Sequence, residues 1–225
     1  MRASLWVVCA AYNEASVIGG VIAGLRAAGH DVIVVDDGSR DGTRAAALAA
    51  GAQVVTHPVN LGQGAALQTG IEFALSRGAE IIVTFDADGQ HSAADIPRLT
   101  DALAREGADF ALGSRFLGSS TNLPTLRRWV LKAATVFTRL TTGLRLTDSH
   151  NGLRAMTRRG AGAICLRQNR MAHASEFLAQ TAESGMRYVE VPVTIEYSAY
   201  SLAKGQRLAD SITILRDLLA QGLSR

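Results

Sequence analysis

IIVTFDAD, at residues 81–88, decides how this chain folds, because an apolar run leads there directly into two acidic side chains. An apolar run that ends in polar residues is typical of a buried parallel strand. Carboxylates just past such a strand lie in the crevice where open α/β sheets bind ligands. Asp86 and Asp88 would repel each other there unless a cation neutralises them, and a hard divalent cation that carries phosphates does this well. The alternative is a turn with two solvated acids.

Four further apolar runs also end in polar clusters. These runs and clusters are Leu5–Cys9 with Ala11–Glu14, Val32–Val35 with Asp36–Ser39, Gln53–Thr56 with His57 and Asn60, and Phe110–Gly113 with Ser114 and Arg115. The carboxyl ends of parallel strands meet at one edge of a sheet, so we expect all these clusters to form a single site.

Helical periodicity separates the predicted strands. The expected helices cover residues 17–25, 43–50, 64–76 and 94–106. Alternating strands and helices predict an α/β fold with a mostly parallel, twisted central sheet and helices on both of its faces. The 225 residues are enough for one substantial core, so we expect a single domain over residues 1–225.

The chain becomes basic in its middle, where it has no acidic residue from Phe110 to Thr147. Within this stretch, residues 126–140 predict an amphipathic helix. Its apolar side holds Trp129, Val130, Ala133, Phe137 and Leu140, and its basic side holds Arg128, Lys132 and Arg139. Such a helix suits an anionic membrane surface. The alternative is a helix that packs on the sheet through its apolar side and leaves its basic side solvated.

The C-terminal residues predict two further elements. Residues 189–195 alternate like a strand with one wet face, and Pro192 indicates an edge or an irregularity there. Residues 208–219 predict a terminal amphipathic helix after a polar loop.

Composition and spacing exclude several classes of protein. No window holds the roughly 18 consecutive apolar residues of a transmembrane helix, and the first residues do not resemble a signal peptide. Cys9 and Cys165 lack metal or redox spacing, which indicates a reduced, cytosolic chain. Gly62 and Gly64 resemble the start of the G-x-G-x-x-G dinucleotide-binding motif, but they follow the third strand and Leu67 stands at the place of the third glycine. This excludes a dinucleotide-binding oxidoreductase, whose motif follows the first strand. With 5% aromatic residues and no zinc spacing, we expect no nucleic-acid binding.

Four motifs occur in order along the N-terminal half: AYNE at 11–14, VVDDGS at 34–39, NLGQG at 60–64 and FDADGQH at 85–91. Together they closely resemble the family 2 glycosyltransferases, which have the GT-A nucleotide-sugar fold. Asp148 with GLR at 152–154, and GSR at 113–115, extend the match towards the polyprenyl-phosphate (dolichol-phosphate) mannosyltransferase branch. The resemblance implies a Rossmann-like, GT-A type fold in which residues 1–115 bind the nucleotide sugar and residues 116–225 bind the acceptor.

The resemblance also implies a reaction and its ligands. A sugar would pass from a nucleoside diphosphate sugar to the acceptor with inversion, and Mg²⁺ or Mn²⁺ would be held by Asp86 and Asp88. Asp88, Arg115 and Asp148 are the expected catalytic residues, and Arg115 would add a second cation at the phosphates. Asp37 would accept a hydrogen bond from the base. The expected nucleotide-sugar contacts are Ala10, Tyr12, Glu14, Val35, Asp36, Asp37, Gly64, Asp86, Ala87, Asp88, Arg115, Lys204 and Arg207.

Three places depart from the family pattern. Ala10 stands where relatives usually carry proline, and Gln63 stands where they usually carry lysine or arginine. The C-terminal Arg-x-x-Gly-x-Ser-Lys pattern is absent, and residues 200–207 read YSLAKGQR instead. Lys204 and Arg207 could still reach a diphosphate or an acceptor phosphate.

The role of Asp148 is open at this stage. Asp148 is the best candidate for a general base, with an orienting role or a pairing with Arg154 as the alternatives. Glu176 is a weaker candidate for the base. His91 is expected to orient Asp88 rather than to act in catalysis.

The acceptor also has more than one reading. A polyprenyl phosphate at the cytoplasmic membrane face needs no general base and accounts for the basic middle of the chain. A lipopolysaccharide or another cell-surface glycan is the alternative, and a non-catalytic nucleotide-sugar or nucleic-acid binder is a remote one. We expect a cytoplasmic protein with peripheral contact at the inner membrane face, in an oligomeric state that is left open.

Overall fold

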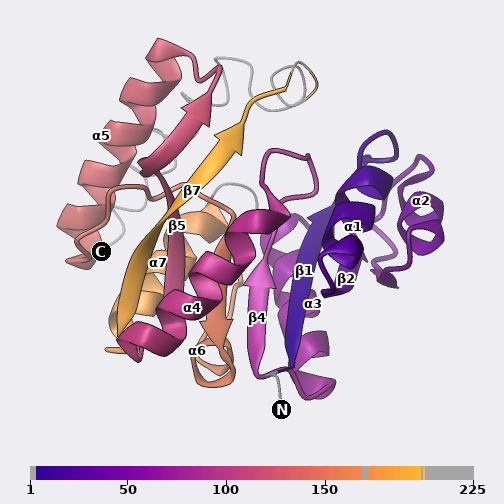
Figure 1. The fold of residues 1–225 in the computed structure, drawn as a ribbon, viewed down its shortest axis with the longest axis horizontal. Coiled ribbons are helices and arrows are strands. Elements are labelled where there is room, and N and C mark those ends of the chain that lie inside the picture. Colours follow the sequence, from indigo (N-terminus) through magenta and orange to yellow (C-terminus); the bar gives the residue numbers. More distant parts are fainter. Residues whose placement is uncertain (1–3, 169–171, 199, 201–225) are drawn as a thin grey trace.

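A seven-stranded sheet organises the chain, of which the computed structural model describes residues 4–168, 172–198 and 200. The strand order is β3-β2-β1-β4-β6-β5-β7, and of these strands β6 alone runs antiparallel to its neighbours (Figure 1). This confirms the predicted α/β fold with a mostly parallel sheet. The strands are β1 (Leu5–Ala11), β2 (Asp31–Asp36), β3 (Gln53–Thr56), β4 (Ile81–Thr84), β5 (Phe110–Thr121), β6 (Arg154–Thr157) and β7 (Tyr188–Glu196).

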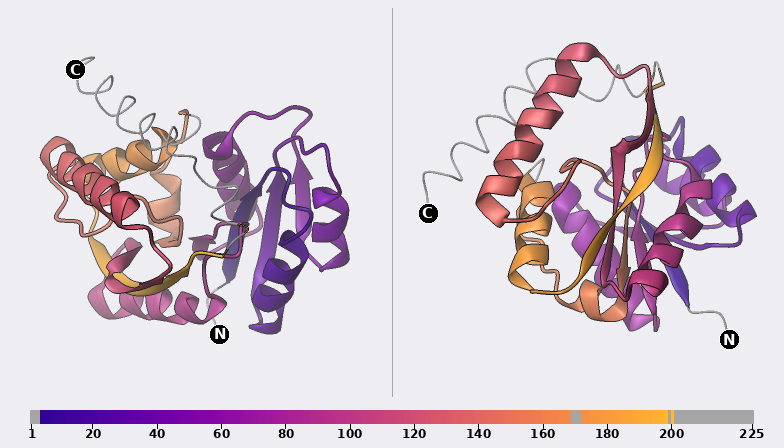
Figure 2. Two further views of the ribbon diagram at one scale, coloured as in Figure 1. Left: turned by 90° about the horizontal axis from the view of Figure 1, so that it is seen from above. Right: turned by 60° about the vertical axis from the view of Figure 1, so that its left-hand side comes forward.

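Helices cover both faces of the sheet (Figure 2). Buried side chains of α1, α2 and α4 pack on one face, and those of α3, α6 and α7 pack on the other. α5 lies outside these layers and packs mainly against α7. The helices are α1 (Ile18–Ala27), α2 (Thr43–Ala49), α3 (Gln63–Ser76), α4 (Ile96–Glu106), α5 (Thr125–Thr142), α6 (Arg158–Gly162) and α7 (Ala172–Glu183).

β4 shows why the opening apolar run is unbroken. Val83 belongs to the core under α1 and α4, whereas Ile82 belongs to the core under α3 and α7. Both side chains are fully buried because helices cover both faces of the strand. Phe85, which the sequence places in the strand, lies just past the end of β4.

Other strands and helices form close to their predicted bounds, with one extension and several additions. β5 continues past Gly113 to Thr121, because Ser119–Thr121 pair with the end of β7 after a register shift. β6, α6 and α7 are not predicted from the sequence. The predicted helix at residues 208–219 lies outside the described residues.

Pro192 lies where its missing N–H costs least. β7 is the edge strand of the sheet, as predicted, and Pro192 lies opposite Ser114. The register shift in β5 follows directly after this pair. A proline cannot donate to the ladder, so it is tolerated at an edge and next to an irregularity.

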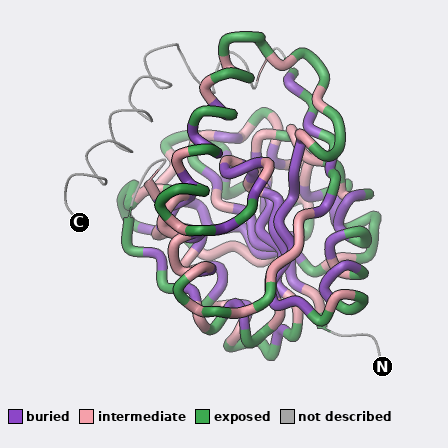
Figure 3. Tube along the Cα trace, turned by 90° about the vertical axis from the view of Figure 1, so that its left-hand side faces the viewer, coloured by how far each residue is buried: buried purple, intermediate pink, exposed green. Residues whose placement is uncertain are grey.

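α5 forms near its predicted range but buries a different face. Leu131, Ala134, Thr135 and Thr138 are buried, whereas Trp129 is 67% exposed. The hydroxyls of the two threonines donate to carbonyl oxygens of the helix itself, so these side chains are satisfied inside the protein. The alternative in which the predicted apolar side packs on the sheet is therefore wrong. Figure 3, which views the molecule from the side where α5 lies, shows exposed segments along this helix.

The sheet topology places a crevice between β1 and β4. The chain moves from β1 outwards to β2 and β3, and β4 pairs on the opposite side of β1. After β1 the chain continues to β2 on one side, and after β4 it continues to β5 on the other, so the strand order reverses between β1 and β4. Ligands of open α/β sheets bind at such a switch point.

Candidate active site

A pocket of about 420 Å³ lies at the carboxyl ends of the parallel strands. The loops of the N-terminal half bring polar side chains to it from four strands, namely Tyr12 and Glu14 after β1, Asp37 after β2, Asn60 after β3, and Asp86, Asp88, Gln90 and His91 after β4. The second half of the chain completes the wall with Arg115, Arg127, His150, Asn151, Gly152, Arg154 and His173. The structure thus brings together clusters that lie far apart in the sequence.

Asp86 and Asp88 both line this pocket, and each has a fixed partner. Asp86 Oδ2 lies 2.9 Å from His91 Nε2. Asp88 accepts from the backbone N–H of Gln90 at 3.1 Å and from its side-chain amide at 2.8 Å. The prediction that His91 orients Asp88 is therefore wrong, because its partner is Asp86.

The two carboxylates affect each other electrostatically. Burial and the neighbouring charge of Asp86 raise the pKa of Asp88 to about 6. Burial would also raise the pKa of Asp86, but the hydrogen bond from His91 and nearby cations keep it below its usual value. Carboxylate oxygens suit Mg²⁺ or Mn²⁺, and a divalent cation would relieve the repulsion between them. Within the described residues, the two carboxylates are not part of a group of three or more potential metal ligands.

Gly152 fixes the position of the Asp86 carboxylate from the other half of the chain. A Cβ atom built on Gly152 would lie 2.1 Å from Asp86 Oδ2, so only glycine fits there. Thr84, at the end of β4, donates its hydroxyl to the carbonyl of Gly152 at 2.7 Å. The loop before β6 therefore packs directly against the Asp86 carboxylate.

Asp37 holds the glycine loop at the pocket edge. Its carboxylate accepts from the backbone N–H groups of Leu61 at 2.9 Å and Gly62 at 2.7 Å, and lies 2.7 Å from His57 Nδ1. Gly62 has a φ of +98°, which favours glycine. Asp37 lines the pocket, but its oxygens are already used to shape the loop, so contact with a base remains a prediction.

The remaining predicted donor contacts divide into two groups. Ala10 and Ala87 line the pocket, and Glu14 accepts a hydrogen bond from the Tyr200 hydroxyl at 2.8 Å. Three other predicted contacts are not among the residues that line the pocket. Val35 and Asp36 are buried under the loops, and Gly64 lies so close to the carbonyl of Gln168 that a Cβ atom would approach it to 2.1 Å. Lys204 and Arg207 lie outside the described residues.

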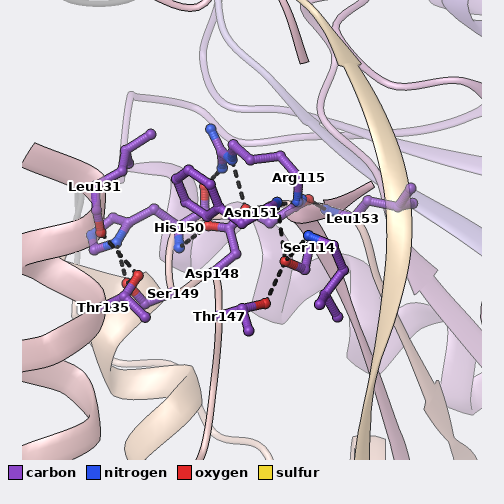
Figure 4. Close-up of polar contacts among 12 residues, drawn as sticks. Ser114, Arg115, Leu131, Thr135, Thr147, Asp148, Ser149, His150, Asn151 and Leu153 are labelled. Carbon is purple, nitrogen blue, oxygen red and sulfur yellow. Dashed lines mark hydrogen bonds and ion pairs between the residues drawn. The ribbon is translucent and has the colours of Figure 1, made fainter. Parts of the chain in front are cut away.

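Asp148 forms a buried ion pair with Arg115 (Figure 4). Its Oδ2 accepts from Arg115 Nε at 2.6 Å and from the Arg115 backbone N–H at 3.1 Å, while Oδ1 accepts from the backbone N–H of His150. Despite burial, the charge of Asp148 raises the pKa of the Arg115 guanidinium. Asp148 does not pair with Arg154, whose Nε donates to the carbonyl of Asn151. The geometry favours the orienting role for Asp148 over proton abstraction, because Oδ2 is bonded to Arg115 and Oδ1 to the backbone of His150.

Arg115 is held on several sides. Besides Asp148, it donates to the Tyr197 hydroxyl at 2.6 Å and to the carbonyl of His150. A guanidinium has five N–H groups, so some remain for a ligand in the pocket. Glu176, the weaker candidate base, accepts from the backbone N–H groups of Arg167 and Gln168 and does not line the pocket.

Two further arginines line the pocket and are not among the residues predicted from sequence. The Arg154 guanidinium lies 4.3 Å from the centroid of the Phe177 ring, and burial lowers its pKa to about 10. Arg127, from the first turn of α5, lies 4.8 Å from the centroid of the Tyr197 ring, and burial lowers its pKa as well. The absence of acidic residues around position 127 is the sequence feature that could have singled out Arg127.

Unpaired polar atoms mark the pocket as a binding site. Within the described residues, the buried side-chain atoms without a hydrogen-bond partner are His91 Nδ1, Arg127 Nε and Asn151 Nδ2. All three residues line the same pocket. Leaving a buried polar group unpaired costs about 1–3 kcal/mol, so such groups usually await a ligand or water. The pocket is therefore built for a polar ligand.

Comparison with known proteins identifies the family. The model of the family described as "Glycosyl transferase family 2" matches residues 6–164. The chain is 30% identical over 237 residues to the UDP-N-acetylglucosamine–dolichyl-phosphate N-acetylglucosaminyltransferase of Methanococcus voltae, covering 96% of this chain and 94% of that protein. It is 35% identical over 174 residues to the undecaprenyl-phosphate mannosyltransferase of Micrococcus luteus, which covers 73% of this chain and 71% of that protein. A crystal structure of Mycobacterium tuberculosis glucosyl-3-phosphoglycerate synthase with Mn²⁺, uridine diphosphate and phosphoglyceric acid shares the fold, with a TM-score of 0.74 and 22% identity over 99% of this chain and 78% of that one.

Proposed function

Because the chain belongs to glycosyl transferase family 2, it is a glycosyltransferase, and we propose that it moves a sugar from a nucleoside diphosphate sugar to a polyprenyl phosphate, with inversion. The names of the two relatives from Methanococcus voltae and Micrococcus luteus both include a polyprenyl-type phosphate acceptor. The arrangement of charges in the pocket supports the same acceptor for this chain.

The donor end of the pocket would lie over β1, β2 and β4. Asp86 and Asp88 would hold Mg²⁺ or Mn²⁺ there, and Asp37 shapes the loop beside it through the backbone of Leu61 and Gly62. A bound divalent cation would stabilise the negative charge that develops on the departing diphosphate. Tyr12 and Glu14 border the pocket on the side where the nucleoside would lie.

The main support for an anionic acceptor comes from the surroundings of the Arg127 side chain. Its guanidinium borders the pocket, its Nε has no hydrogen-bond partner, and burial makes its charge costly in the absence of an anion. A phosphate oxygen would satisfy both the charge and the N–H group. A phosphate acceptor is already a nucleophilic anion and needs no general base, which agrees with an Asp148 that is engaged by Arg115.

α5 would bring the enzyme to its lipid acceptor at the membrane face. Leu126, Trp129 and Leu140 are exposed on this helix at 57%, 67% and 81%. Exposed Arg128, Lys132 and Arg139 accompany them, and an apolar face with flanking cations binds anionic lipid surfaces. Arg127 of the same helix borders the pocket, so a docked α5 would place the lipid phosphate near the site. In the described residues, no helix combines the length and the hydropathy needed to cross a membrane.

Two measurements test this function. The first is a thermal-shift panel with GDP, UDP, dTDP and CDP, each with and without Mn²⁺, because a ligand that binds only the folded state raises the Tm. We expect one nucleotide to raise the Tm in a metal-dependent way, and no shift with any of them would contradict the donor site. The second is sugar transfer to a polyprenyl phosphate, compared with the polyprenol of equal chain length. Transfer to the alcohol, or only to a glycan, would contradict the phosphate acceptor.

A further inference from the structure

The end of β7 contacts both the carboxylate loop and the arginines of the pocket. The backbone N–H of Glu196 donates to the carbonyl of Gln90 at 2.9 Å, and Ile195 forms a β-bridge with His91. Both contacts join β7 to the loop that carries Asp86 and Asp88. The next residue of the chain is Tyr197, so its place is set relative to that loop.

Tyr197 contacts two arginines that line the pocket, Arg115 and Arg127. The residue is 1% exposed, and its hydroxyl accepts from Arg115 Nη1 at 2.6 Å. The centroid of its ring lies 4.8 Å from the Arg127 guanidinium. Its backbone is held as well, since its N–H donates to the carbonyl of Thr121 at 3.3 Å and its carbonyl accepts from Asn122 Nδ2 at 3.4 Å.

We infer that Tyr197 is a positioning residue, which holds Arg115 and Arg127 side by side as one subsite for the acceptor phosphate. This inference rests on the proposed function and adds to it a residue that determines how the acceptor binds. Two guanidinium groups repel each other, and Tyr197 offsets this with a hydrogen-bond acceptor for one and an aromatic face for the other. Arg127 lines the pocket, and its Nε is buried without a hydrogen-bond partner within the described residues.

The contacts of Glu196 and Ile195 with the loop of Asp86 and Asp88 connect the two arginines to the expected metal site. Because Tyr197 follows Glu196 directly, the arginine pair keeps a constant distance from the loop of Asp86 and Asp88. Transfer needs the acceptor oxygen and the donor sugar at a defined separation, and small displacements of either reduce the rate strongly. A shift of Tyr197 should therefore affect the acceptor more than the donor.

A matched pair of variants tests the role of the hydroxyl. Tyr197→Phe keeps the ring under Arg127 and removes the acceptor for Arg115. Tyr188→Phe is the control, because the Tyr188 hydroxyl also accepts one hydrogen bond, from the backbone N–H of Arg145 at 2.7 Å, at the opposite end of β7 and outside the pocket. The probe is a short-chain, water-soluble isoprenyl phosphate, whose Kd is measured by calorimetry and whose KM and kcat are measured with the donor present.

We expect Tyr197→Phe to weaken binding of the isoprenyl phosphate and to raise its KM by about tenfold, the size expected for one hydrogen bond to a charged group. The nucleotide-induced shift in Tm should stay at the wild-type value, and Tyr188→Phe should change neither quantity. An acceptor Kd and KM for Tyr197→Phe within twofold of wild type, or an equal loss in donor binding, would overturn the positioning role while the proposed function stands. Failure of the wild type to bind the isoprenyl phosphate would instead refute the proposed acceptor, and this inference with it.

Tyr197→Leu extends the series by removing the aromatic face under Arg127 as well. We expect a larger rise in the acceptor KM than for Tyr197→Phe, provided that the Tm shows a folded protein. If the acceptor KM of Tyr197→Phe and Tyr197→Leu rises only in proportion to their loss in Tm, Tyr197 acts through packing alone. That result would overturn the inference.

Discussion

The two halves of the chain hold their share of the pocket in different ways. In the N-terminal half, backbone N–H groups hold the carboxylates: Asp36 accepts from Ser39 and Asp88 from Gln90, two or three residues away, and Asp37 accepts from Leu61 and Gly62, 24 and 25 residues away. In the second half, the pocket depends on contacts between distant side chains. Arg115 bonds to Asp148 across 33 residues and to Tyr197 across 82. The carboxylates of the donor end are therefore held mainly by backbone N–H groups of its loops, whereas Arg115 at the other end is held by side chains from distant segments.

The first prediction concerns a substitution that removes an expected metal ligand at the donor end of the pocket. Asp88→Ala removes one of the two carboxylates that would hold the cation, so we expect activity to fall by at least about a thousandfold, as several kcal/mol of charge stabilisation are lost. The metal-dependent Tm shift with the preferred nucleotide should disappear. Asp101→Ala, on the exposed side of α4, is the matched control and should behave like wild type. A metal-dependent shift that survives Asp88→Ala would refute the metal assignment.

The second prediction concerns Gly152, which packs against the Asp86 carboxylate from the other half of the chain. Gly152→Ala would place a Cβ atom 2.1 Å from Asp86 Oδ2 and must displace that carboxylate. We expect activity to fall about a hundredfold, the usual consequence of a misplacement near 1 Å. Gly162→Ala is the control, because no atom lies within 4 Å of a Cβ built there. Equal activity of the two folded variants would show that Asp86 need not stay where the structure has it.

The third prediction concerns a substitution that should affect binding of the acceptor but not of the donor. Arg127→Ala removes the half-buried cation with the unpaired Nε, and we expect the KM for a short-chain isoprenyl phosphate to rise about 10- to 100-fold. Donor-induced Tm shifts should not change. Arg128→Ala removes the neighbouring exposed arginine and should leave this KM unaffected. An equal effect of both variants would mean that only the general basic charge of α5 matters.

The fourth prediction separates membrane docking from chemistry. The double variant Trp129→Ser and Leu140→Ser makes the exposed apolar side of α5 polar, and binding to vesicles with anionic lipids should weaken about tenfold or more. Activity on the short-chain acceptor should be retained. Leu48→Ser, at an exposed leucine of α2, is the control in a vesicle sedimentation assay. Unchanged sedimentation of the double variant would exclude α5 as the docking surface.

The smallest expected effect lies outside the pocket, where Asp109 joins β5 to the end of β6. Its carboxylate accepts from Thr157 Oγ1 at 2.8 Å and Arg159 Nε at 3.0 Å, and the Arg159 hydrogen bond lowers its pKa. Asp109→Asn should lower the Tm at pH 7 by about 2–4 °C without changing activity.

The sign of the pH dependence follows from that lowered pKa. The contribution of the Asp109 carboxylate to stability is fully present above its pKa in the unfolded chain, about 3.9, and is lost as the pH falls through the lower pKa of the folded protein. The difference in Tm between wild type and Asp109→Asn should therefore shrink under acidic conditions. A difference that does not change with pH would show that the charge of Asp109 contributes nothing.

Local patterns in the sequence by themselves determined the α/β class, the parallel strands up to β5, and the convergence of Tyr12, Asp37, Asp86 and Asp88 on one edge. Each of these features depends on residues that are close in sequence. A strand buried on both faces must be continuously apolar, and the loop after it must carry the polar groups, so both can be recognised without knowledge of the rest of the chain.

Only the tertiary structure decided which residue pairs with Asp148, which face of α5 is buried, and that Arg127 and Tyr197 belong to the site. β6 is four residues long and carries no periodic pattern of its own, so its place depends on β4 and β5. The buried threonines of α5 are polar in any hydropathy pattern, and their burial is possible because their hydroxyls bond to the helix itself. Ion pairs and aromatic contacts between segments far apart in the chain have no local pattern, because their free energy arises only once the fold has brought the partners together.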